Sequence, residues 1–126
     1  MKRINYSALG QAIDTTWGRS STPKSSSFSV KVSLAGDGRL MVSYQAIVNF
    51  VTEKEMVTMK RLYSEESASI VAAALKTVKE NYKDLTGDSL KLNETDVNES
   101  LEIIGFGVHN PKRTAYFRRK SIVEFA

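Results

Sequence analysis

The sequence has no cysteine, a single histidine, two prolines and no long apolar run. Without cysteine, the chain forms no disulfide, performs no thiolate catalysis and holds no cysteine-ligated zinc or iron–sulfur site. The one histidine, His109, stands beside a predicted turn. Because there is no second histidine, we interpret His109 as a surface residue rather than as half of a nucleophile–base pair. No segment approaches the ~20 apolar residues of a membrane helix, so we expect no membrane partner.

The motifs that bind nucleotides or activate a serine are also missing. No serine stands in a G-x-S-x-G elbow, and no glycine-rich P-loop is present. Gly105 and Gly107 are two residues apart, but they lack a third glycine and a following helix. The acids Glu94, Asp96 and Glu99 lack the glycine of an EF-hand loop. We therefore expect no enzyme: no catalytic residue, no cofactor, no metal site and no small-molecule substrate.

The residues that are present describe one globular domain with an N-terminal extension. The chain has 126 residues, 41% hydrophobic and 25% charged, which suits a single domain of ordinary size. Residues 1–27 are predicted to form an arm that contains a short helix and a serine-rich linker, SSTPKSSS at residues 20–27. Residues 28–126 are predicted to form a single α+β domain.

The helix in the arm is indicated by an apolar stripe. Leu9, Ile13 and Trp17 recur at i, i+4 and i+8, and Ser7 is suited to be the N-cap. A helix of two or three turns is not stable alone. The stripe must therefore dock, either on its own domain or, as an exchanged arm, on a neighbouring subunit, and both interpretations stay open.

Alternating apolar and polar residues predict two β-hairpins. The first covers residues 28–50, with a glycine-rich turn (AGDGR) at its centre. The second joins a strand over residues 101–109 to a strand over residues 114–125 through the turn NPKR. The polar, acidic residues 93–100 (NETDVNES) are predicted to form a loop that precedes the second hairpin.

A helix is predicted between the hairpins, over residues 64–86, with Gly87 ending it. Its apolar stripe consists of Val71, Ala74, Leu75, Val78, Tyr82 and Leu85. Residues 51–63 support two interpretations. A capping box at Thr52 and Glu55 favours a helix, whereas a fresh helix start at Ser64 favours a turn at 52–55 and a third strand over 56–63. We predict the strand and leave the helix open.

These elements define an α+β fold of order β-β-(β)-α-β-β, plus the N-terminal arm. It is an antiparallel sheet of two hairpins, with the strand over 56–63 as an optional fifth, and one amphipathic helix packed on one face. The predicted core consists of Phe28, Val30, Val32, Val42, Tyr44, Val48, Ile70, Val71, Leu75, Val78, Ile103, Phe106 and Val123.

Charge is gathered in two opposed blocks. Residues 84–102 hold six acids and one base, and residues 112–120 hold five bases and no acid. In the basic block, Tyr116, Arg118 and Lys120 share one face of a strand. Cations beside an aromatic ring suit single-stranded nucleic acid, to which Lys76, Lys79 and Lys83 would add a second basic row. Under this alternative hypothesis, the binding residues are Lys112, Arg113, Tyr116, Phe117, Arg118, Arg119 and Lys120.

The first hypothesis is a non-enzymatic structural protein that assembles through subunit–subunit contacts. An acidic segment of one copy can pair with the basic strand of the next, and head-to-tail contacts of this kind build rings or arrays. The arm would add an apolar anchor. The predicted contact residues are Leu9, Ile13, Trp17, Glu94, Asp96, Glu99, Arg118 and Lys120. The competing interpretation is that the acidic and basic blocks neutralise each other within one monomer.

The layout of the whole chain resembles the small structural and assembly proteins of large tailed phages. In those proteins a polar N-terminal arm, here residues 1–27, precedes a compact β-rich domain with one helix. The resemblance includes no residue motif, so no functional residue is carried over. It implies a virion component of the capsid, neck or tail, located in the virion or the host cytoplasm, with its own copies, other virion proteins or nucleic acid as partners. The N-terminal MKRINYSALG lacks an apolar stretch of signal-peptide length, so we expect no secretion by that route.

Overall fold

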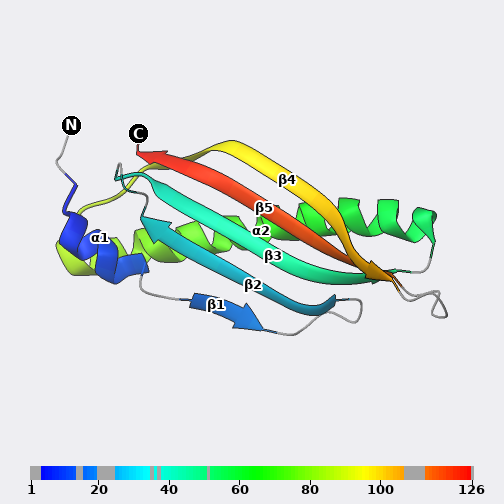
Figure 1. The fold of residues 1–126 in the computed structure, drawn as a ribbon. Coiled ribbons are helices and arrows are strands. Elements are labelled where there is room, and N and C mark those ends of the chain that lie inside the picture. The colour runs from blue at the N-terminus through cyan, green and yellow to red at the C-terminus, as the bar shows by residue number, and fades with distance from the viewer. Residues whose placement is uncertain are drawn as a thin grey trace.

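The fold is an antiparallel sheet with one long helix across one face. The computed structural model describes residues 4–13, 16–19, 25–34, 36, 38–50, 52–106 and 113–125. The sheet order is β1-β2-β3-β5-β4, and α2 runs behind it (Figure 1). The predicted α+β class with two hairpins is confirmed. In chain order the elements are α1 (Tyr6–Ile13), β1 (Thr16–Arg19), β2 (Ser25–Leu34), β3 (Leu40–Phe50), α2 (Glu53–Thr86), β4 (Leu92–Phe106) and β5 (Arg113–Phe125).

Both predicted hairpins form, but the first strand of the second begins at Leu92 rather than at residue 101, and its predicted end over 107–109 and the turn residues 110–112 lie outside the described residues. β2 pairs with β3 from Leu34 opposite Leu40, and Gly38 in the connection has φ of 86°, a value that glycine adopts without strain. β4 pairs with β5, and β5 also pairs with β3, so the second hairpin continues the sheet of the first. The alternation of side chains along each strand leaves one set under α2 and the other set on the uncovered face.

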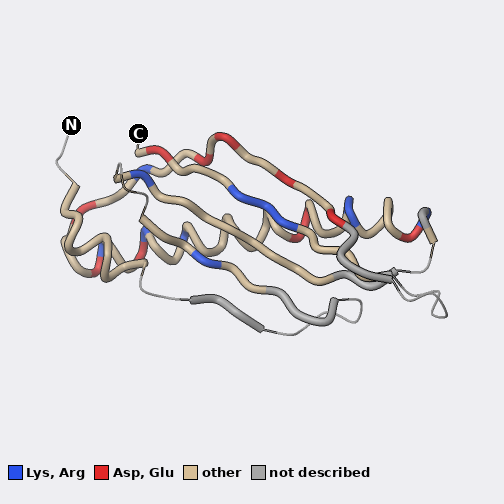
Figure 2. Tube along the Cα trace, in the orientation of Figure 1, with Lys and Arg blue, Asp and Glu red and all other residues tan. Residues whose placement is uncertain are grey.

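The predicted acidic loop over residues 93–100 is wrong, because these residues belong to β4. The acids of β4 therefore lie beside the bases of β5 (Figure 2). β4 is the outer strand, where polar side chains meet water and discourage pairing with another chain. Between Thr95 and Asn98 the register shifts by one residue, and Asp96 there has φ of 49°. This β-bulge interrupts the alternation of apolar and polar residues that would have indicated a strand.

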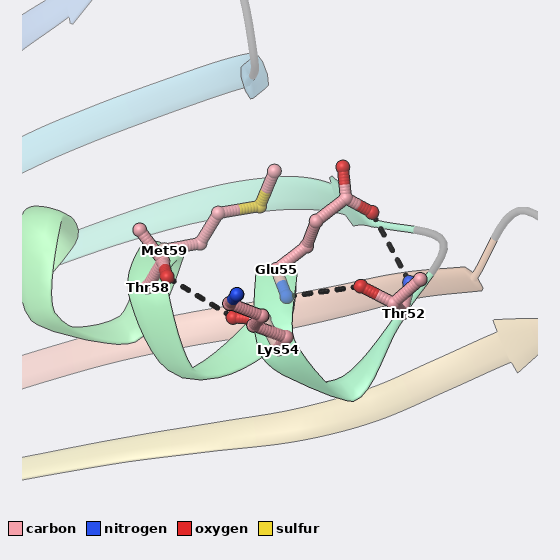
Figure 3. Close-up of a pocket in the computed structure, with 5 residues that line it drawn as sticks. All are labelled: Thr52, Lys54, Glu55, Thr58 and Met59. Atoms are coloured by element: carbon pink, nitrogen blue, oxygen red, sulfur yellow. Dashed lines mark hydrogen bonds between the residues drawn. The ribbon is translucent and has the colours of Figure 1, made fainter.

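The predicted third strand over residues 56–63 is also wrong, because α2 is continuous from Glu53. Its start is the capping box: the Thr52 hydroxyl accepts from the Glu55 N–H, and the Glu55 carboxylate accepts from the Thr52 N–H, both at 3.1 Å (Figure 3). Ser64 therefore lies inside the helix and caps nothing. With 34 residues, α2 is about 50 Å long and matches the long strands that it crosses.

The end of α2 is set by Gly87, as predicted. Gly87 has φ of 77°, in the left-handed region, and its N–H donates to the Lys83 carbonyl at 2.7 Å. The buried stripe of α2 extends further toward its N-terminus than predicted and omits Leu85, which is 51% exposed. Its buried members are Met59, Tyr63, Ser67, Val71, Ala74, Leu75, Val78 and Tyr82.

The N-terminal segment packs on its own chain. Helix α1 lies against the C-terminal half of α2 (Figure 1), and Leu9 is fully buried. The cap of α1 is Asn5 rather than Ser7, since the Asn5 side chain accepts from the Ala8 N–H at 3.1 Å. The Asn5 N–H in turn donates to the Tyr82 hydroxyl at 3.0 Å. Trp17 belongs to β1, opposite Val30 of β2, and not to the helix.

The core fills the space between α2 and the sheet and extends under α1. Buried members of the predicted core are Val30, Val32, Val42, Tyr44, Val71, Leu75, Val78 and Val123, with Ile70 partly buried. The side chains of Phe28, Val48, Ile103 and Phe106 lie outside the described part of the chain. Large buried residues that the predicted core omitted are Leu9, Leu40, Met59, Tyr63, Tyr82, Leu90 and Phe117.

Substituting Leu9→Ala should destabilise the fold by about 3 kcal/mol, because it leaves a cavity between α1 and α2. The matched control, Leu62→Ala on the exposed side of α2, should cost less than about 1 kcal/mol. Urea denaturation measures both. The unfolding midpoint of the wild type should not change with protein concentration, whereas docking of α1 on a neighbouring subunit would make it rise with concentration.

Candidate functional site

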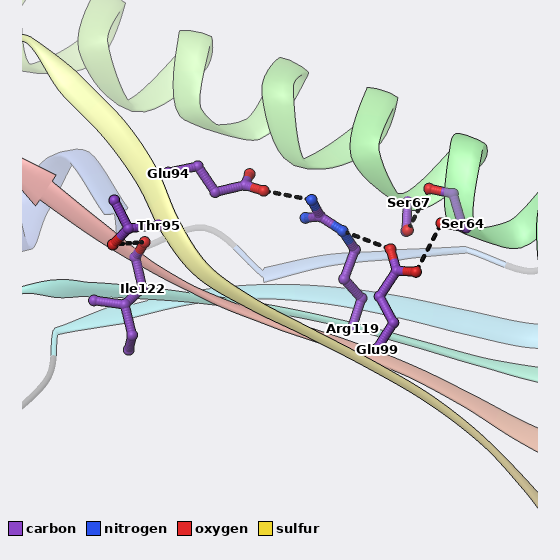
Figure 4. A network of polar contacts seen from close by, with 7 residues as sticks. All are labelled: Ser64, Ser67, Glu94, Thr95, Glu99, Arg119 and Ile122. Atoms are coloured by element: carbon purple, nitrogen blue, oxygen red, sulfur yellow. Dashed lines mark hydrogen bonds and ion pairs between the residues drawn. The ribbon is translucent and has the colours of Figure 1, made fainter.

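A buried arginine joins the two charge blocks inside the monomer. Arg119 of β5 is only 6% exposed and points between the sheet and α2. Its Nε donates to Glu99 Oε1 at 3.1 Å, and its Nη2 pairs with Glu94 Oε1 (Figure 4). Burying a guanidinium requires paired negative charge, and β4 supplies it. The interpretation that the two blocks neutralise each other within one chain therefore holds for these three residues.

The bulge in β4 is what allows both carboxylates to reach the same cation. Glu94 and Glu99 are five residues apart, so in a regular strand they would point to opposite faces. The extra residue between Thr95 and Asn98 restores both to the covered face, with Glu99 directly opposite Arg119. Strict alternation of side chains along the strand would therefore not predict that Glu94 and Glu99 share a face.

Helix α2 completes a polar layer over the middle of the sheet. The Ser64 hydroxyl donates to Glu99 Oε2 at 2.7 Å (Figure 4), and the Tyr44 hydroxyl of β3 donates to Glu66 Oε1 at 3.1 Å. Burial, with the neighbouring Glu66 carboxylate second, holds the pKa of Tyr44 well above its usual value. These bonds tie α2 to β3 and, through Glu99, to β4.

This polar layer is suited to hold α2 on the sheet rather than to carry out a reaction. Both carboxylates accept hydrogen bonds from Arg119, and Glu99 also accepts from Ser64, so both oxygens of Glu99 and one oxygen of Glu94 are occupied within the protein. Arg119 Nη1 and Ser121 Oγ are buried without a hydrogen-bond partner among the described residues. With two carboxylates and one guanidinium, the cluster is unsuited to hold an anion there.

The opposite, uncovered face of the sheet carries a cationic patch, the open-face patch, defined by Lys31, Gln45, Tyr116, Arg118 and Lys120. The strand register aligns it: Lys31, Ser43 and Lys120 form one row across three strands. Gln45 and Arg118 form the adjacent row, and Ile47 and Tyr116 the next. Lys31, Arg118 and Lys120 are exposed, and none forms an ion pair with another residue that the structure describes.

Within the patch, an aromatic ring and a guanidinium are held together. Arg118 Cζ lies 4.6 Å from the centroid of the Tyr116 ring, a cation–π geometry. The Tyr116 hydroxyl donates to Gln45 Oε1 at 3.0 Å, which fixes the ring from the neighbouring strand. The arrangement presents a planar cation on a supported ring to solvent.

The structure divides the predicted site residues among three places. Of the predicted nucleic-acid residues, Tyr116, Arg118 and Lys120 share the open face as predicted, whereas Phe117 and Arg119 are buried under α2. Lys112 lies outside the described residues, and only the backbone of Arg113 is described. Lys76, Lys79 and Lys83 are exposed on α2, which lies across the other face of the sheet (Figure 1), so they add no second row to this patch.

The predicted subunit contacts are similarly divided. Leu9 and Ile13 are buried against the protein's own helix, and Glu94 and Glu99 are engaged by Arg119. Asp96 is exposed on β4, as Arg118 and Lys120 are on β5. The side chain of Trp17 is not among those described. Prediction omitted Lys31 and Gln45, although the alternation of the first hairpin already placed both on its polar face.

Two surface hollows lie at the ends of α2, away from both clusters. One, of about 200 Å³, is lined by Thr52, Lys54, Glu55, Thr58 and Met59 (Figure 3). The capping box occupies the Thr52 hydroxyl and the Glu55 carboxylate there. The other, of about 230 Å³, is lined by Lys79, Glu80, Lys83, Ser89 and Leu90. The described residues include no group of three or more side chains placed to bind a metal ion. Among these same residues, no helix is both long and apolar enough to cross a membrane.

No protein-family model matches the chain, and neither the curated proteins nor the solved structures include a significant match to it.

Replacing Arg119 with Met should destabilise the protein by about 3 kcal/mol, because it leaves two partly buried carboxylates without their cation. The control Arg118→Met, on the open face, should change stability by less than about 0.5 kcal/mol. Adding Glu94→Gln and Glu99→Gln to the Arg119→Met protein should restore part of the loss. Equal urea midpoints for the two arginine variants would contradict a role for Arg119 in holding α2, β4 and β5 together.

Alkaline pH should destabilise the wild type through Tyr44. Because the folded pKa is raised, the contribution of Tyr44 is complete below its unfolded pKa of about 10 and is lost as the pH rises toward the folded value. Above about pH 10, Tyr44→Phe should therefore lose stability less steeply than the wild type, by up to about 1.4 kcal/mol per pH unit. The control is Tyr116→Phe. A Tyr44→Phe slope parallel to the wild type in urea titrations at high pH would contradict this.

Proposed function

We propose that this protein is a non-enzymatic structural protein that works in a macromolecular assembly, by docking the open face of its sheet onto an anionic partner. A capsid, neck or tail component of a phage virion is the setting that the layout of the chain suggests. The observation that carries the proposal is the open-face patch: three exposed cations on adjacent rows of one uncovered sheet face. Complementary charge on a partner would set the register of the contact.

The arrangement of charge argues against a symmetric contact between two open faces. Such a contact would bring Lys31 and Lys120 of one copy against the same residues of the other, and like charges repel. A head-to-tail contact avoids this. Asp96 is exposed on the outer strand β4, and it is the acid through which one subunit would meet the patch of the next. Contacts of that kind close into rings or extend into arrays.

A second candidate partner for the same face is single-stranded nucleic acid. The observation that favours it is the Tyr116–Arg118 pair, because a planar cation on an aromatic ring matches a nucleobase better than it matches a carboxylate. Either partner makes the open face the working surface of the protein.

A double charge reversal, Lys31→Glu with Lys120→Glu, should abolish docking while leaving the fold intact, because both side chains are exposed. The matched control reverses two exposed lysines of α2, Lys76→Glu with Lys79→Glu. Light scattering at low and high salt compares the mass with the 14.0 kDa monomer, and a labelled oligonucleotide is titrated in parallel.

The wild type and the α2 control should form the same salt-sensitive complex in at least one of the two assays, and the open-face variant should form none. The proposed function is contradicted if the open-face variant behaves as the wild type does in both.

A further inference from the structure

We propose that the open-face patch is a binding site for single-stranded nucleic acid, in which one base stacks on the Arg118 guanidinium and the flanking phosphates contact Lys120 and Lys31. This inference rests on the open face being the working surface of the proposed function, and it names the partner.

The stacking position is built from three strand-borne side chains. Arg118 lies over the Tyr116 ring at 4.6 Å, and the bond from the Tyr116 hydroxyl to Gln45 anchors that ring to β3. One side of the guanidinium is thus supported, and the side chain is exposed to solvent. Nucleobases stack on arginine planes as they do on aromatic rings, and this contact tolerates any base. Tyr116 is therefore a positioning residue, and Arg118 is the residue that touches the base.

The phosphate contacts follow from the register. Lys120 is two residues from Arg118 on β5 and so lies about 7 Å away along the strand. Lys31 lies across β3 from Lys120, two strand spacings or about 10 Å away, with Ser43 between them. The rest of this middle region is neutral and polar. Glu124 lies toward one end of the face, and Glu102 lies on β4 directly opposite Tyr116, so an anionic chain is kept away from the β4 edge and follows Lys120 and Lys31 across β3.

The orientation of Arg119 fixes how strongly the site can bind. Its charge is turned inward and paired with Glu94 and Glu99, so only three cations face the ligand. Arg118 stacks on a base, so Lys31 and Lys120 neutralise two phosphates, which for a single strand gives a log–log salt dependence of about −1.4. A duplex keeps its bases stacked within itself and offers none to Arg118, so single strands should bind more tightly than duplex.

The experiment measures fluorescence anisotropy of labelled oligothymidylate, oligoadenylate and a duplex of equal length over a range of salt concentrations. We expect both single strands to bind the wild type with a slope of about −1.4 and the duplex to bind more weakly. Arg118→Lys keeps the charge but loses the plane, so affinity should fall about tenfold with an unchanged slope. Lys31→Ala with Lys120→Ala should instead remove most of the slope, because it removes both phosphate contacts.

Two Tyr116 variants and one control on α2 separate positioning from folding. Tyr116→Leu should weaken binding about as much as Arg118→Lys, and Tyr116→Phe, which keeps the ring, should weaken it less. Lys76→Ala with Lys79→Ala on α2 should change nothing. The urea midpoint of each variant checks that these substitutions leave the fold intact.

The outcomes distinguish this inference from the function on which it rests. If no oligonucleotide binds, but self-association is lost in the Lys31→Glu, Lys120→Glu protein, the partner is another subunit, and the inference is overturned while the proposed function stands. If oligonucleotides bind but Arg118→Lys matches the wild type, or duplex binds as well as single strands, the stacking site is overturned. If neither activity depends on the open face, both proposals fall.

Discussion

The buried charge of Arg119 determines how α2, β4 and β5 pack against one another. A guanidinium in that position is costly to bury unless negative charge meets it. β4 supplies Glu94 and Glu99, and α2 supplies Ser64, which holds Glu99 from the other side. A slip of one residue in β4 would turn Glu99 to the opposite face, so the ion pairs also specify the strand register. One cation therefore constrains three elements at once.

The same constraint shapes the outer surface. Residues alternate across β5, so fixing Arg119 inward fixes Arg118 and Lys120 outward. The internal cluster also withdraws two acids and one base from the surface, which leaves the exterior more basic than the net charge of +4 suggests. The charge of the open face, on which the proposed binding depends, thus follows from the inward orientation of Arg119.

Prediction succeeded where a single periodicity runs without interruption. The hairpin of β2 and β3 and the second half of α2 have such patterns, and both formed as predicted. It failed where a local signal competed with packing. Ser64 followed by acids has the pattern of a helix start, yet α2 continues through it because Met59 and Tyr63 are buried on the same stripe as Val71. β4 was hidden because its bulge breaks the alternation and its exposed edge is polar.

The candidate site was likewise predictable only where it depends on local periodicity. Local pattern was sufficient to place Tyr116, Arg118 and Lys120 on one face of a strand, because the period of two is a property of the backbone. It could not say which face α2 would cover, nor that Lys31 and Gln45 from a distant hairpin would join them. Those facts depend on strand order and register, which are fixed by contacts between residues far apart in the chain. The composition alone excluded cysteine chemistry. The inward orientation of Arg119, by contrast, depends on the carboxylates of β4, so only the tertiary structure decided it.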